Sequence, residues 1–167
     1  ITPVEATATD SSGNFVKAYF DVVVVDNEAP VTLVLADVTD ECTAAATAPT
    51  TTDNCAGIIT GTTSDPLTYA VQGTHEITWS FDDGNGNVIT VKQNVIVNDT
   101  TAPNTPTLAD VTGQCSATAA VPTTTDNCAG TINGTTSNAT TYNTQGTHVI
   151  TWSFDDGNGN VITANQN

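Results

Sequence analysis

The residues best suited to chemistry in this chain are aspartates and asparagines that recur in short clusters. Residues 82–87 read Asp-Asp-Gly-Asn-Gly-Asn, and Asp53-Asn54 is a second cluster. Carboxylate and amide oxygens are ligands that Ca²⁺ prefers, and the ion takes six to eight of them. The alternation Asp83-x-Asn85-x-Asn87 has the opening spacing of a calcium loop, although Val88 occupies the glycine position of an EF-hand. The alternative is that Asp, Asn and Gly are here because tight turns use them.

The clusters recur because the sequence repeats itself every 73 residues. Cys42 recurs as Cys115, and the motif Asp-Asn-Cys-Ala-Gly starts at both Asp53 and Asp126. Aligning 31–94 with 104–167 gives 45 identical positions out of 64, without insertion or deletion. Similarity at a fixed period is the signature of a modular array. A unit of this length is large enough to build a small core of its own.

This period divides the chain into parts of three repeats. We expect residues 1–28 to be the C-terminal hairpin of one repeat and residues 29–101 to be a complete repeat. Residues 102–167 would be a third repeat that lacks the end of its last strand. We call the boundary after residue 28 the first junction and the boundary after residue 101 the second junction.

The calcium hypothesis places its ligands at these two junctions, where the acidic loops and the linkers are expected to meet. At the first junction the candidate ligands are Asp26, Glu28, Asp53, Asp82, Asp83, Asn85 and Asn87. At the second junction they are Asp99, Asp126, Asp155, Asp156, Asn158 and Asn160. A bound ion would stiffen each junction and neutralise its crowded carboxylates.

The charge balance narrows the choice of partners. The chain has 18 acidic residues against two lysines and no arginine, which gives a net charge of −16. Such a surface repels phosphate backbones and anionic headgroups, so we expect neither nucleic-acid binding nor direct membrane contact. It can collect cations instead.

The hydrophobic pattern predicts strands. Ile77, Trp79 and Phe81 alternate with polar residues, which is the period of a strand with one buried face. The Asn-Gly turn that follows predicts a hairpin with the strand after residue 87. Shorter strands are expected at 31–36, 44–47, 57–63 and 67–71. Six or seven short strands in about 73 residues predict a tandem array of antiparallel β-sandwich domains of immunoglobulin-like type.

The middle repeat contains Cys42 and Cys55, and the third repeat contains Cys115 and Cys128. One pair per domain predicts a disulfide within each repeat and an oxidising compartment. A straight strand would hold the two sulfurs of a pair too far apart, so the chain would have to fold back near Pro49 and Pro122. A zinc site is the alternative, although two thiols without a nearby histidine make a poor one.

These motifs carry a family resemblance. The succession Cys…Pro-Thr-Thr-Thr-Asp-Asn-Cys, then Gln-Gly-Thr-His-Glu-Ile-Thr-Trp-Ser-Phe-Asp-Asp-Gly-Asn-Gly-Asn, then Asn-Asp-Thr-Thr-Ala-Pro resembles the hyalin repeat, an immunoglobulin-like domain. The Thr-rich, Trp-bearing version is similar to repeats of giant surface adhesins of gliding Bacteroidetes. Further cysteines found in many members are missing here, which leaves Cys42 and Cys55 as partners within one repeat. The resemblance implies an extracellular, cell-surface location and no catalysis.

Two functions follow as expectations. The first is a structural stalk or fibre of a secreted adhesin, a rigid spacer in adhesion or gliding motility whose immediate partners are neighbouring repeats of the same chain. Surface polysaccharide or an external substratum is a further possible partner. The second is an array of carbohydrate-binding modules, which would need exposed aromatic side chains. No constellation of catalytic residues is found, and Thr100, in Asp99-Thr100-Thr101, is a candidate for glycosylation.

Overall fold

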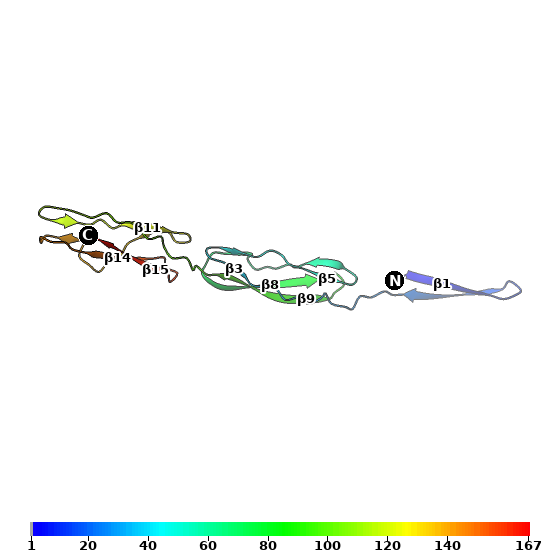
Figure 1. The fold of residues 1–167 in the computed structure, drawn as a ribbon. Coiled ribbons are helices and arrows are strands. Elements are labelled where there is room, and N and C mark those ends of the chain that lie inside the picture. Colours follow the sequence, from blue (N-terminus) through cyan, green and yellow to red (C-terminus); the bar gives the residue numbers. More distant parts are fainter. Residues whose placement is uncertain (1) are drawn as a thin grey trace. The chain divides into compact units, whose positions relative to one another are not determined.

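A computed structural model describes residues 2–167, and every regular element in this range is a β-strand. The strands pair into small sheets of two or three (Figure 1). They are β1 (Thr2–Thr9), β2 (Phe15–Val22), β3 (Val38–Asp40), β4 (Ala44–Ala45), β5 (Thr50–Asp53), β6 (Gly57–Thr60), β7 (Thr68–Tyr69), β8 (Gly73–Asp82), β9 (Val88–Val97), β10 (Ala117–Thr118), β11 (Thr123–Asp126), β12 (Gly130–Asn133), β13 (Thr141–Tyr142), β14 (Ile150–Asp155) and β15 (Val161–Gln166). The predicted all-β class is confirmed. Within 2–167 no helix is long and apolar enough to cross a membrane.

The chain forms two compact units, and their limits differ from those of the sequence repeats. The first unit holds the residues up to Leu33 together with Ala48–Thr62 and Ser80–Val91. The second unit holds Val34–Thr47, Thr63–Trp79 and Lys92–Asn167. The acidic clusters of the first junction therefore belong to the first unit, and those of the second junction belong to the second unit.

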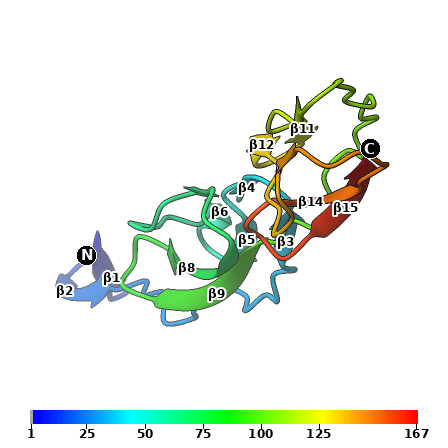
Figure 2. The ribbon, with the colours of Figure 1, turned by 90° about the vertical axis from the view of Figure 1, so that its left-hand side faces the viewer.

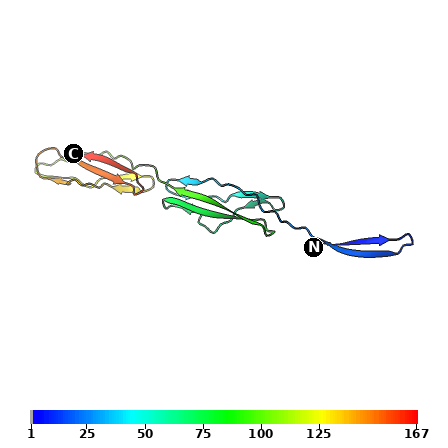
Figure 3. The ribbon, with the colours of Figure 1, turned by 90° about the horizontal axis from the view of Figure 1, so that it is seen from below.

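The predicted hairpins are present at the end of each repeat. β14 pairs antiparallel with β15, from Ile150 opposite Gln166 to Asp155 opposite Val161 (Figure 2). Its turn contains Gly157 at φ 82° and Gly159 at φ 108°, a conformation that L side chains rarely adopt. β1 and β2 also form a hairpin, although their turn at 10–14 is Asp-Ser-Ser-Gly-Asn and contains no Asn-Gly (Figure 3). The Asn-Gly turns thus direct the hairpin as the sequence indicated.

One sheet departs from the expected antiparallel arrangement. β9 lies between β8 and β3, and β3 runs parallel to β9, with Val38 opposite Val95 and Asp40 opposite Val97. Asn98 continues the pairing by donating its backbone N–H to the carbonyl oxygen of Asp40 at 2.9 Å. The expectation of a wholly antiparallel sheet was therefore wrong. Because the pair is parallel, the residues that follow β3 and those that follow β9 emerge at the same end.

The alternating aromatic residues build the core. In the third repeat Ile150, Trp152 and Phe154 are 4%, 1% and 0% exposed, and Ala119 and Ile132 complete the buried cluster. The Trp152 indole Nε1 donates to Gln166 Oε1 at 3.0 Å, which satisfies its one polar atom. In the middle repeat Trp79 is likewise 1% exposed and donates to Gln93 at 2.9 Å. The predicted direction of these side chains is confirmed.

The short strands were predicted less well. The expected strands at 44–47, 57–63 and 67–71 shorten to β4, β6 and β7. The expected strand at 31–36 is not formed, and Val34 there is 98% exposed. β5 lacked a hydrophobic signal because its residues are threonines and an aspartate. It is held by pairing with β6 and by Thr51, whose hydroxyl donates to the carbonyl of Val31 at 2.6 Å.

Candidate functional site

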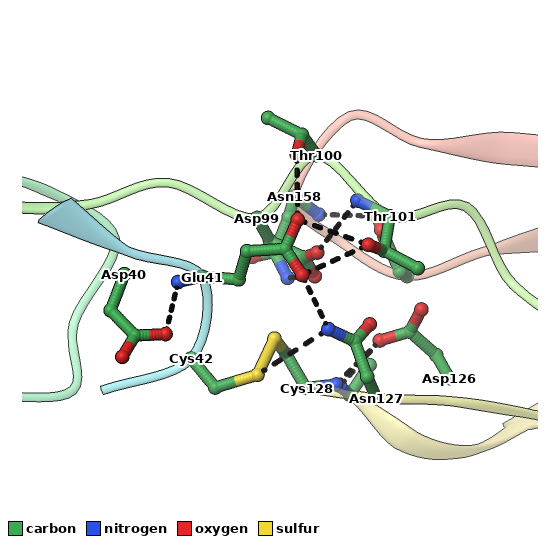
Figure 4. The surroundings of a disulfide bond; sticks show 12 residues. Asp40, Glu41, Cys42, Asp99, Thr100, Thr101, Asp126, Asn127, Cys128 and Asn158 are labelled. Atoms are coloured by element: carbon green, nitrogen blue, oxygen red, sulfur yellow. Dashed lines mark hydrogen bonds between the residues drawn. A yellow bond between two sulfur atoms is a disulfide. The ribbon is translucent and has the colours of Figure 1, made fainter. Parts of the chain in front are cut away.

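A disulfide joins Cys42 of the middle repeat to Cys128 of the third repeat, across the second junction (Figure 4). The two residues are 86 positions apart in sequence, and their Cα atoms lie 5.0 Å apart, within the usual range for bonded cysteines. Cys55 and Cys115 are free and exposed. The bond therefore links two repeats of the sequence, both ends of it within the second unit.

The predicted pairing within each repeat, Cys42 with Cys55 and Cys115 with Cys128, was wrong. The residues between Cys115 and Cys128 form β10 and β11, and these strands pair with β13 and β12 rather than with each other. Pro122 between them does not reverse the chain. Its carbonyl accepts the N–H of Gly134 at 2.8 Å, which continues the antiparallel pairing of β11 with β12 by one position. The segment thus continues forward and carries the second cysteine away from the first.

The elements on both sides of the junction position the bonded cysteines. Cys42 follows β3, which its parallel partner β9 directs toward the linker. Cys128 lies in the turn between β11 and β12, where Asp126 Oδ1 accepts the backbone N–H of Cys128 and of Ala129, each at 2.8 Å. Gly130 closes this turn at φ 72°. The pairing of β3 with β9 on one side and a locally determined turn on the other therefore bring the two sulfurs together.

The Glu41 carboxylate gathers the groups around the disulfide (Figure 4). It accepts hydrogen bonds from the hydroxyls of Thr100 at 2.6 Å and Thr101 at 2.9 Å, and from the side-chain amide of Asn127 at 2.8 Å. The hydroxyl of Thr100, followed by that of Thr101, holds the pKa of Glu41 below its ordinary value. Glu41 thereby connects the end of β3, the linker and the third repeat. Thr100 is exposed, and the proposed glycosylation of its hydroxyl stays a prediction.

Gln72 fixes the two chain segments that enter the junction. Its Nε2 donates to the carbonyl of Glu41 at 2.9 Å, and its Oε1 accepts the backbone N–H of Asp99 at 2.9 Å. Sequence reasoning placed Asn127 at this junction but missed Glu41 and Gln72. A signal existed for Gln72, since the motif Gln-Gly-Thr-His recurs and Gln145 makes the corresponding bond to the carbonyl of Gln114 at 2.8 Å.

Only some of the candidate calcium ligands come together. Asp99 and Asp126 lie with Cys128 so that one ligand atom of each is within 4.8 Å of the others, and the two carboxylates are 4% and 8% exposed. The side chain of Asn158 donates to Asp99 Oδ2 at 2.9 Å, and that of Asn160 donates to the Asp99 carbonyl at 3.2 Å. The last hairpin turn therefore lies against the linker, as expected.

The first junction repeats this cluster with Asp26, Asp53 and Cys55. Asp53 is 8% exposed, and its Oδ1 accepts the N–H groups of Cys55 and Ala56 at 2.8 and 2.9 Å. Asn85 donates to Asp26 Oδ2 at 3.0 Å. The same chemistry thus occurs twice, one period apart.

The other candidate ligands serve the turns. Asp82 and Asp155 each accept one backbone N–H two residues ahead, at 2.8 Å, and are exposed. The carboxylate of Asp156 is buried, which raises its pKa, but hydrogen bonds from Asn158 and Asn160 outweigh burial and lower it. Asp83 has the corresponding partners, Asn85 and Asn87. Glu28 accepts the side-chain amide of Asn54 at 2.6 Å. Turn chemistry accounts for the aspartates of this set, whereas Glu28 binds the turn that follows β5.

Three aromatic side chains of β2 are exposed: Phe15 by 65%, Tyr19 by 68% and Phe20 by 53%. Trp79 and Trp152 are buried, and Tyr142 stacks on His148 with ring centroids 4.1 Å apart. A cavity of about 450 Å³ is lined by Val111 and Ile150 among others. We assign no ligand to this cavity.

Comparisons with protein-family models, curated proteins and solved structures found nothing that matches this chain. A disulfide is typical of proteins outside the cytoplasm, where thiols are not kept reduced.

Proposed function

We propose that this chain is a segment of the structural stalk of a secreted cell-surface adhesin, in which consecutive repeats are cross-linked covalently. The observation that carries the proposal is the Cys42–Cys128 bond, because it connects two repeats that the backbone already joins. A second covalent connection restricts how far two repeats can separate. Such a restriction is useful to a spacer that transmits force and has no evident use in an enzyme pocket.

The repeat register extends this arrangement along an array. Cys115 corresponds to Cys42, and Cys55 corresponds to Cys128, because each pair is 73 residues apart. In an array of such repeats, Cys115 would bond to the following repeat and Cys55 to the preceding one. Every repeat would then be tied to both neighbours, and those neighbours are the principal partners of the chain.

The resemblance to hyalin repeats supports the same role and adds an expected fold. We propose an immunoglobulin-like sandwich for each repeat, with the alternating Trp-bearing strand at its centre. The net charge of −16 favours solubility and disfavours self-association of stalks. We assign no catalytic role to the chain.

Intact cells of the organism that encodes this chain provide the test. Antibodies raised against the chain should stain unpermeabilised cells, and cells that carry Cys42→Ser together with Cys128→Ser should detach at lower shear than wild-type cells. Equal surface amounts of the two proteins, measured by the same antibody, are the control. Staining that requires permeabilisation would contradict the proposal, and saturable binding of the chain to a glycan array would favour the carbohydrate-binding alternative.

A further inference from the structure

Two buried carboxylates lie together at the second junction without a positive charge of the chain beside them. Asp99 is 4% exposed and Asp126 is 8% exposed. The two lysines of the chain are bound elsewhere, Lys17 to Glu5 at 2.6 Å and Lys92 to Glu76 at 2.7 Å, and arginine is absent. Burying a charge without a partner is costly, and burying two like charges side by side is more so.

One oxygen of this pair lacks any hydrogen-bond donor. Asp126 Oδ1 accepts two backbone N–H groups, whereas Asp126 Oδ2 is buried and has no partner. At the first junction Asp53 has the same pattern, with Oδ1 occupied and Oδ2 buried and unpartnered. Buried polar atoms in proteins nearly always have a hydrogen-bond partner or a ligand. An unpartnered carboxylate oxygen at two equivalent positions therefore indicates a ligand at each of them.

We propose that each junction binds one Ca²⁺ ion, held by Asp99 and Asp126 at the second junction and by Asp26 and Asp53 at the first. Ligand atoms within 4.8 Å of one another suit this ion, because Ca–O distances of about 2.3–2.6 Å place two ligands up to about 5 Å apart. The remaining coordination positions would be filled by water. Cys128 does not make this a zinc site, because its sulfur is in a disulfide and is not a thiolate.

The proposal selects four of the thirteen acidic and amide residues that the sequence suggested. The turn carboxylates are left out because none of them has a buried oxygen without a partner. Each selected pair contains one such oxygen and joins a linker to the β-turn of the following repeat. Bound calcium would thus hold the linker against that repeat. The site concerns the same junctions as the stalk function but does not depend on it.

Calcium titration of the chain by isothermal calorimetry, with the disulfide intact, tests the proposal. We expect two ions per chain, with Kd on the order of 10⁻⁴ to 10⁻³ M as in extracellular calcium modules. Asp126→Asn and Asp53→Asn should each reduce the number to one, and the double variant should bind none. Asp155→Asn removes one equivalent charge from a neighbouring turn and should retain two ions with Kd changed less than about threefold.

A double variant that still binds two ions, or a wild-type chain without saturable binding at millimolar calcium, would overturn the proposal. So would the loss of an ion in Asp155→Asn. A second measurement does not depend on the folding of any variant: millimolar CaCl₂ should raise the Tm of the wild-type chain by at least about 4 °C relative to EGTA. An unchanged Tm would contradict the inference.

Discussion

Pulling the chain by its two ends should extend it about 280–310 Å farther after Cys42–Cys128 is reduced than before. The bond encloses a sequence separation of 86 residues, and each extended residue adds about 3.3–3.6 Å. While the bond is intact, this segment is bypassed even when every strand has unfolded, because the two Cα atoms stay 5.0 Å apart. Single-molecule force spectroscopy with and without reductant measures the difference as contour length.

The released length also distinguishes the two possible pairings. Bonds within each repeat would enclose 55 − 42 = 13 and 128 − 115 = 13 residues, and together would withhold only about 90 Å. The variant Cys55→Ser/Cys115→Ser should behave as the wild-type chain, whereas Cys42→Ser should show the full length without reductant. A release near 90 Å would refute the connection between repeats.

Replacing Trp152 by alanine should lower the free energy of unfolding of the third repeat by about 3–5 kcal/mol, the usual range for a buried tryptophan. The side chain is 1% exposed and lies in a cluster with Ile150 and Phe154, so its removal leaves a cavity in a small core. Urea unfolding followed by circular dichroism measures the change.

Trp152→Phe is the matched control for this prediction. It keeps an aromatic ring but removes the N–H that Gln166 accepts, and it should lose about 1–2 kcal/mol of stability. A Trp152→Ala variant within about 1 kcal/mol of the wild-type chain would show that the alternating strand does not form the core.

The local elements of this fold could be predicted because single residues determine them. The alternation of Ile150, Trp152 and Phe154 indicated which face is buried, and the Asn-Gly turns indicated the hairpins. β5 could not be found in the same way, because its pattern is Thr-Thr-Thr-Asp and its place depends on a hydrogen bond from Thr51 to Val31. Tertiary context determined this strand.

The disulfide could not be predicted for a reason particular to periodic sequences. Cys42 lies 86 residues from Cys128, and 86 is one period of 73 plus the 13 residues that separate the cysteines of one repeat. Pairing within a repeat and pairing with the next repeat therefore leave the same pattern in the sequence. What decides between them is the parallel pairing of β3 with β9, which directs Cys42 toward the junction.

The residues proposed to bind calcium could likewise not be selected from the sequence alone. Composition indicated which residue types could bind an ion, but Asp155 and Asp126 are equally acidic in the sequence. They differ because Asp126 is buried with an unpartnered oxygen, whereas Asp155 is exposed and accepts a backbone N–H of its own turn. Burial and orientation follow from the turn after β11, which the sequence pattern did not resolve.

Disulfide mapping tests the central claim, that consecutive repeats are bonded to each other, most directly. The purified chain should be alkylated without reduction, digested with proteases that cleave at acidic residues, and analysed by mass spectrometry. We predict one cross-linked peptide pair that contains Cys42 and Cys128, with Cys55 and Cys115 alkylated. Cross-linked pairs of Cys42 with Cys55 and of Cys115 with Cys128 would contradict the account.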